Sequence, residues 1–199
     1  MSQGGKASLD SLERQARGYY VAGDFQAAIE IFDESLARLE GKMDPAHPRV
    51  LANRNDLARA CRYAGWFDRA LSLYRQILDI QIRQLGPDHP DALRSRSRIA
   101  NTYYAAGRFE EAIRLFKDTL AKRKDVLGWD HPDTLRSRSS LANSYHAVGS
   151  YRRAINLHEE IVTVRQRVLG PDHERTIASK TRLVEARQAG MAGEAGQTR

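Results

Sequence analysis

Four histidines lie in a short turn sequence whose residues could do chemistry. LGPDHP (85–90), LGWDHP (127–132) and LGPDHE (169–174) each place a histidine next to an aspartate, and MDPAHP (43–48) is a weaker match. A neighbouring His and Asp could form a general base with its orienting partner, or two metal ligands. A catalytic pair is needed only once, however, whereas His47, His89, His131 and His173 recur at 42-residue steps. We therefore interpret the segment as a linker, with histidines too far apart along stacked repeats to share a metal ion.

Other residue types keep the same 42-residue period, which predicts a repeat protein. The recurring positions are a glycine (Gly23, Gly65, Gly107, Gly149), an aromatic residue two positions later (Phe25, Phe67, Phe109, Tyr151) and an alanine (Ala28, Ala70, Ala112, Ala154). Between these markers, apolar residues recur at three- and four-residue steps, as on one face of a helix. Each repeat should contain two helices, the first starting after His-Pro and ending at the glycine, the second ending at the linker glycine. No segment alternates like a strand.

These rules set the expected organisation of the chain. Repeats should span about 8–46, 47–88, 89–130 and 131–172, followed by a capping helix at 174–189. Asp10 and Glu13 fit a capping box at the start of the first helix. Residues 1–7 and the small, polar tail 190–199 are expected to be disordered, leaving one repeat domain over 8–189.

The repeat resembles the tetratricopeptide repeat. The third repeat carries this pattern at Ile99, Ala100, Tyr103, Gly107, Phe109, Ala112 and Phe116. The 42-residue period with its LGPDHP linker is similar to that of the kinesin light chain type. The resemblance implies an all-α, right-handed superhelical solenoid of four helix-turn-helix units plus a C-terminal capping helix. It also implies a non-enzymatic adaptor for protein–protein interaction, with a peptide bound in the concave groove lined by the first helices.

The first helices place polar side chains about one turn apart along this expected groove. The candidate peptide-binding residues are Arg17, Tyr20, Asn55, Arg59, Arg62, Arg94, Ser97, Asn101, Tyr104, Arg136, Ser139, Asn143 and His146. Arginine attracts carboxylates, and asparagine can both donate to and accept from a peptide backbone. Asn101 and Asn143 occupy equivalent sites and resemble the peptide-gripping asparagine of the family. We therefore expect an acidic peptide or protein segment as ligand.

Two further sets of residues are expected to be structural. Arg54, Arg96 and Arg138 form another column at the 42-residue step, and helical phase turns them toward the neighbouring second helices, where they should form ion pairs or hydrogen bonds. His158 stands where the other repeats have Phe32, Tyr74 and Phe116. It is interpreted as a loosened core position or a polar contact with a helix of the next layer, rather than as a catalytic residue.

Composition narrows the function further. The 199 residues carry a net charge of +7, and most of the basic residues are arginines. Cys61 is the single cysteine, which excludes an intrachain disulfide and a multi-cysteine zinc site, so neither metal nor cofactor is expected. No apolar run suggests a membrane span or secretory signal, which favours a cytoplasmic protein. No phosphate loop, HExxH or nucleophile elbow is present. The alternatives left open are nucleic-acid binding, self-association into a homodimer, and a repeat scaffold recruited as an enzyme.

Overall fold

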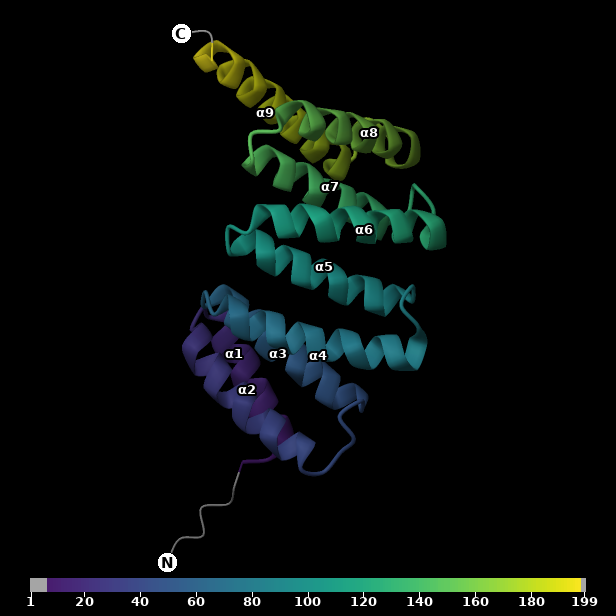
Figure 1. Cartoon of the computed structure of the whole chain (residues 1–199). Helices are drawn as coiled ribbons and strands as arrows, with labels where there is room; N and C mark the ends of the chain where they lie inside the picture. The colour runs from purple at the N-terminus through teal and green to yellow at the C-terminus, as the bar shows by residue number, and fades with distance from the viewer. Residues whose placement is uncertain (1–6, 198–199) are drawn as a thin grey trace, which may run out of the picture. The chain divides into compact units, whose positions relative to one another are not determined.

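The computed structural model describes residues 7–197, and of residues 194–197 only the backbone. Within this range the chain is entirely helical, without strands, and its helices follow one another in the order expected for repeated pairs (Figure 1). They are α1 (Leu9–Val21), α2 (Phe25–Glu40), α3 (Pro48–Tyr63), α4 (Phe67–Leu85), α5 (Pro90–Ala105), α6 (Phe109–Leu127), α7 (Pro132–Ala147), α8 (Tyr151–Leu169) and α9 (Glu174–Gln197). The predicted all-α stack of helix pairs is confirmed.

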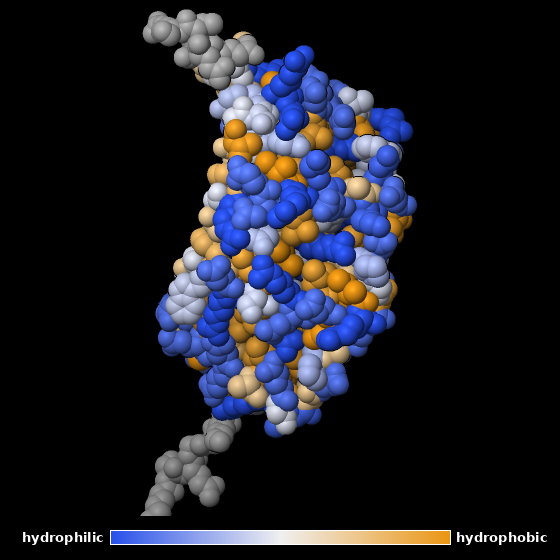
Figure 2. Space-filling view, in the orientation of Figure 1, coloured by the Kyte–Doolittle hydropathy of each residue, from blue (hydrophilic) through white to orange (hydrophobic). Residues whose placement is uncertain are grey.

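The described residues divide after Pro87 into two compact bodies. The N-terminal body contains α1–α4 and the C-terminal body α5–α9; in each, every helix packs against the next one along the chain. The apolar face of each helix is buried against these neighbours, with residues such as Phe32 and Tyr74 in the first body and Phe116 and Ile161 in the second. The outer faces are mainly polar, with apolar patches between the polar side chains in the view of Figure 2.

The linker histidines are helix caps, as the repetition of the linker indicated. Nδ1 of His47, His89, His131 and His173 accepts a hydrogen bond from the backbone N–H two residues later, at 3.1 or 3.2 Å. The first turn of a helix has unpaired N–H groups, so a side-chain acceptor at this position stabilises the helix start. In three of the linkers, proline follows as the first helical residue, where its missing N–H costs nothing.

The glycine of each hairpin has a backbone conformation that other residues adopt only with strain. Gly107, for example, has φ of +73° between α5 and α6. The backbone N–H of the next residue, Arg108, then donates to the carbonyl of Tyr103 at 2.9 Å and closes the end of α5. This is the geometry that makes glycine common just after a helix.

Two of the three arginines in the structural column are buried and paired with carboxylates. Arg54 Nη2 donates to Glu40 Oε1 at 2.5 Å and so connects α3 with α2. Arg138, whose side chain is only 1% exposed, has Nε 3.5 Å from Glu160 Oε2 on α8, and its guanidinium lies 4.3 Å from the centre of the Trp129 ring. Their predicted structural role is confirmed; Arg96 is half-buried on α5.

The start of α1 differs from the predicted capping box. Ser8 is the N-cap, and its side chain accepts from the backbone N–H of Ser11 at 3.2 Å. Asp10 and Glu13 instead both accept hydrogen bonds from Arg49 at the start of α3, with Glu13 at 2.9 Å. An arginine can bind two carboxylates at once, and these contacts raise the pKa of Arg49. The Asp10 and Glu13 side chains therefore connect α1 with α3 instead of capping α1.

The C-terminal tail also differs from its prediction. The expected disorder from residue 190 is not observed, because α9 continues to Gln197. A Cβ atom at Gly193 would lie 3.0 Å from Tyr151 Cε2, so the glycine lets α9 approach the ring at the start of α8. Of the segments expected to be disordered, residues 1–6 and 198–199 lie outside the described range.

His158 is buried on α8, 3% exposed, which confirms its assignment to the core. Burial lowers the pKa of its imidazole, and the positive charges of Arg182 and His146 lower it further, while Glu185 acts in the opposite direction. The neutral form is therefore the one that fits the folded protein. The pKa of the histidine in the unfolded chain is about 6.5. As the pH falls below this value, the unfolded chain binds a proton that the folded chain does not bind, and the free energy of unfolding decreases.

The equivalent position is a phenylalanine in α2 and α6 (Phe32 and Phe116). Replacing His158 with phenylalanine should therefore remove this loss of stability at acid pH. Below about pH 6.5 the wild type should lose up to about 1.4 kcal/mol of unfolding free energy per pH unit relative to His158→Phe, until the lowered folded pKa is reached. Urea unfolding of both proteins at about pH 8 and about pH 5.5 measures this difference. Equal losses in the two proteins would show that His158 is not the group responsible.

Several predicted exclusions can be compared with the described residues. Among residues 7–193 no group of three or more His, Cys, Asp or Glu side chains is arranged to hold a metal ion. None of the helices in the described range has the length and apolar character needed to cross a membrane. Cys61 is buried, and burial raises the pKa of its thiol to about 11.

Candidate functional site

In the N-terminal body, two of the predicted groove arginines share one carboxylate. Arg17 Nε lies 3.4 Å from Asp56 Oδ2, and Arg59 Nη2 lies 3.9 Å from the other oxygen of the same carboxylate. The Arg59 guanidinium also lies 4.7 Å from the centre of the Tyr20 ring. Asp56 lies one turn from Arg59 and faces α1, so it compensates part of the positive charge on these two helices.

Aromatic side chains occupy the rest of this face. Tyr20 meets Phe25 and Tyr63 edge-on, with ring centres 5.6 and 5.8 Å apart, and Arg62 lies 4.3 Å from the Tyr63 ring centre. The Arg62 contact lowers the pKa of the Tyr63 hydroxyl. The buried Oδ1 of Asn55 accepts no hydrogen bond within the described residues. The aromatic rings of this surface are packed together, and Asp56 compensates part of its positive charge.

In the C-terminal body, the predicted residues of α5 and α7 are mostly accessible. Arg94 and Arg136 each donate to the aspartate three positions earlier, Asp91 and Asp133. These pairs are exposed, and such i,i+3 pairs contribute only about 0.2–0.5 kcal/mol. A ligand carboxylate could therefore replace the aspartate at little cost.

The remaining predicted positions on these helices differ in exposure. Asn101 and Asn143 are exposed, and Tyr104 is 37% exposed with its ring edge-on to Phe109. His146 is half-buried with its ring 5.2 Å from that of Tyr151. Ser97 donates to the carbonyl of Leu93 at 3.2 Å, and Ser139 is buried, contrary to its prediction as an open groove position. The asparagines are thus the polar side chains best placed to meet a ligand.

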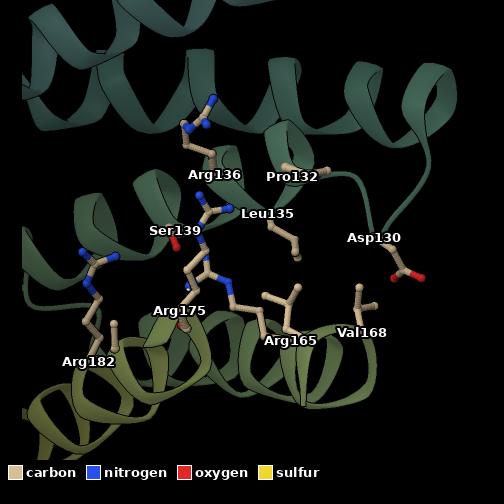
Figure 3. A pocket seen from close by; sticks show the side chains of 11 residues that line it. Asp130, Pro132, Leu135, Arg136, Ser139, Arg165, Val168, Arg175 and Arg182 are labelled. Carbon is tan, nitrogen blue, oxygen red and sulfur yellow. Dashed lines mark hydrogen bonds between the residues drawn. The ribbon is translucent and has the colours of Figure 1, made fainter. Parts of the chain in front are cut away.

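A cavity of about 370 Å³ lies between α7 and α9 and is closed on one side by the end of α8 (Figure 3). Arg175 and Arg182 rise from α9 toward α7, where Ser139 and Leu135 lie. The lining residues are Asp130, Pro132, Leu135, Arg136, Ser139, Arg165, Val168, Leu169, Arg175, Ala178 and Arg182. Two predicted site residues, Arg136 and Ser139, are therefore in a real cavity, but most of its charge comes from residues that the sequence reading missed.

Positive charge in this cavity is only partly compensated. Arg165 is half-buried, and its Nη1 donates to the backbone carbonyl of Arg175 at 3.0 Å and to Ser179 Oγ. Burial, followed by the charges of Arg182 and Arg175, lowers the pKa of Arg165. The single acidic lining residue, Asp130, accepts a hydrogen bond from Arg167 at 2.5 Å. Within the described residues, neither Arg175 nor Arg182 has a carboxylate partner for its side chain.

A comparison of positions 42 residues apart could have identified these arginines from the sequence. Arg165 stands 42 residues after Arg123, which makes equivalent hydrogen bonds to the Asp133 carbonyl at 3.0 Å and Ser137 Oγ at 2.6 Å. Arg175 stands where α5 and α7 have Asp91 and Asp133. The charge at this position is therefore reversed in α9. The prediction treated α9 as a cap, so its side chains were not compared with those of the other first helices.

The tetratricopeptide repeat is the family whose models match this chain, over residues 8–83 and 67–125 and again over residues 134–175. The chain therefore belongs to the tetratricopeptide repeat family, whose stacked helix pairs are scaffolds for protein interaction. The 42-residue, kinesin light chain-like subtype expected from the sequence is confirmed by solved structures.

One of these structures is a protein of Podosopora anserina described as a kinesin light chain with nearly identical TPR-like repeats. It is 32% identical, with a TM-score of 0.78, and the match covers 96% of this chain and 90% of that one. BtubC (BKLC) from P. vanneervenii is 20% identical with a TM-score of 0.71 over 94% of this chain and 76% of that chain. The apo form of RapI is 11% identical with a TM-score of 0.73, covering 96% and 66%. The last two show the fold alone. No curated protein sequence matches the chain.

Proposed function

We propose that this protein is a non-enzymatic adaptor that binds an acidic peptide or protein segment, and that the cavity between α7 and α9 receives part of it. The observation that carries the proposal is the pair Arg175 and Arg182, which lack carboxylate partners among the described residues and lie beside the half-buried Arg165. Like charges held close together raise the local positive potential, and a ligand carboxylate would relieve it. Guanidinium groups bind carboxylates through two parallel hydrogen bonds, which gives both affinity and direction.

The apolar part of the lining indicates a side chain beside the carboxylates. Leu135, Val168 and Ala178 line the same cavity as the arginines. A peptide with a medium-sized apolar residue next to glutamate or aspartate satisfies both surfaces. Beyond the cavity, Asn101 and Asn143 are exposed on α5 and α7, where they could hydrogen-bond to the backbone of the same extended segment.

Nucleic-acid binding fits this cavity less well. Proteins that bind single strands combine cationic grooves with aromatic side chains on which bases stack. No aromatic residue is among those that line the cavity. The site therefore offers charge without stacking, and its apolar side chains favour a peptide.

A titration of the full chain tests the proposal. The test uses a fluorescein-labelled peptide with alternating glutamate and leucine, and the same peptide with glutamine at every glutamate. The glutamate peptide should bind at least about tenfold more tightly, because a hydrogen bond to a charged group contributes about 1.5–3 kcal/mol. Fluorescence anisotropy measures both affinities. Equal affinities would contradict the proposal, as would tighter binding of a single-stranded oligonucleotide with a steep loss of affinity in salt.

A further inference from the structure

The linker between α6 and α7 contains a residue that the function above does not use. Trp129 stands where the equivalent linkers have Pro87 and Pro171. It is 48% exposed, so a large part of the side chain faces solvent. Its ring centre lies 4.3 Å from the guanidinium of the buried Arg138 and 4.5 Å from Lys124 Nζ. The indole is thus held in place by two cations while part of it faces solvent.

Trp129 lines a second cavity, of about 420 Å³, formed by α6, α7 and α8. Its apolar lining includes Leu120, Leu141, Leu157 and Tyr145. This cavity shares no residue with the one between α7 and α9. An open apolar depression of this size accepts one large side chain from a partner.

The rim of this second cavity is cationic. Lys117, Lys124 and Arg153 line it, and no acidic residue is among the lining residues. Arg153 lies 5.5 Å from the Tyr145 ring centre, so two of the three cations are positioned by aromatic faces. Glu160, the carboxylate nearest to Arg138, is paired with that arginine. The rim is therefore complementary to negative charge beside an apolar side chain.

A neighbouring depression shares Lys117, Tyr145 and Arg153 with this cavity but is also lined by Glu110 and Asp118. These carboxylates would repel those of a ligand, whereas no acidic residue is among those that line the Trp129 cavity. A ligand should therefore place its carboxylates at the Trp129 cavity.

We propose that the Trp129 cavity is a second docking site, for a short acidic segment of a partner protein that inserts one large apolar side chain between α6 and α8. The apolar side chain contacts Trp129, Leu141 and Leu157, and its flanking carboxylates bind Lys124 and Arg153. The site lies on the α6 and α8 side of the C-terminal body and is separate from the α7–α9 cavity. It does not depend on the function proposed for that cavity.

The protein offers a site-specific signal for this docking. Trp66 and Trp129 are its two tryptophans, so in a Trp66→Phe background the emission reports on Trp129 alone. An unlabelled peptide with one leucine followed by several glutamates should shift this emission to the blue as the indole leaves water. Replacing the leucine by alanine should weaken binding about tenfold, because burial of a leucine side chain contributes more binding free energy than burial of an alanine side chain.

Two sets of variants distinguish this site from other sites. Lys124→Glu with Arg153→Glu should weaken the emission response about tenfold, while Arg152→Glu, an exposed neighbour outside the cavity, should leave it unchanged. Trp129→Pro, which restores the residue of the other linkers, should lower peptide affinity measured by anisotropy to the same extent. The emission response should persist in Arg175→Glu with Arg182→Glu.

Three results would overturn the proposal. The first is an emission spectrum that does not change at peptide concentrations that saturate anisotropy. The second is a response that disappears in Arg175→Glu with Arg182→Glu, which would assign the peptide to the α7–α9 cavity alone. The third is an equal response to an oligonucleotide of the same charge.

Discussion

Replacing Phe116 with alanine should lower the free energy of unfolding of the C-terminal body by about 3–5 kcal/mol, the cost of removing a large side chain from a close-packed interior. Phe116 is 1% exposed and packs in a cluster with Ala100, Ala112 and Leu141. Tyr103, Leu120, Tyr145 and Leu157 surround this cluster. The small alanines cannot move to fill the space, because they already bring the helix backbones close together.

Urea unfolding followed by Trp129 emission in the Trp66→Phe background measures this loss. Glu110→Ala, an exposed change on the same helix, is the matched control and should cost less than about 0.5 kcal/mol. A loss below about 1 kcal/mol for Phe116→Ala would mean that the repeats do not bury their aromatic residue as described.

Reversing the charge of both Arg175 and Arg182 to glutamate should weaken binding of the acidic peptide by about 100-fold or more, equivalent to about 2.7 kcal/mol. Each change removes a charge-assisted hydrogen bond and adds a like-charge repulsion. Both side chains are exposed on α9 and neither has a carboxylate partner within the described residues, so the fold should tolerate the change. The reversal also removes the repulsion that the charges of Arg182 and Arg175 exert on Arg165, whose pKa they lower.

The N-terminal body supplies the matched control for this prediction. Arg17→Glu with Arg59→Glu changes the net charge by the same amount, but these arginines already share Asp56. Affinity should change less than about threefold, a long-range effect that salt screens. Equal losses in the two double variants would show that net charge, rather than the α7–α9 cavity, attracts the peptide.

Helix positions were predictable from the sequence because they depend on local rules repeated four times. Glycine permits the backbone conformation at Gly107, and proline and histidine suit the first turns of α5 and α7. The end of α9 was not predictable in the same way. Gly190 and Gly193 lie close to Tyr151, and both lie beyond the 16-residue length of α3, α5 and α7.

The candidate site was predicted in part. Periodicity identified the helices that carry polar residues, and the structure places Arg136 and Ser139 in the α7–α9 cavity. Periodicity could not show which guanidinium groups are already paired. Pairing depends on the direction of side chains on different helices, as with Arg17 and Asp56. The prediction also undervalued α9, where Arg175 stands at the position of the aspartates of α5 and α7.

A charge exchange across the α7–α9 cavity tests the central claim most directly. The variant Arg175→Glu with Arg182→Glu is titrated with the acidic peptide and with a second peptide in which lysine replaces every glutamate. If these two side chains meet the charges of the ligand, the variant should bind the lysine peptide with an affinity within about tenfold of that of the wild type for the acidic one. Loss of the acidic peptide without any gain for the lysine peptide would contradict direct contact, and undiminished binding of the acidic peptide would place the ligand elsewhere.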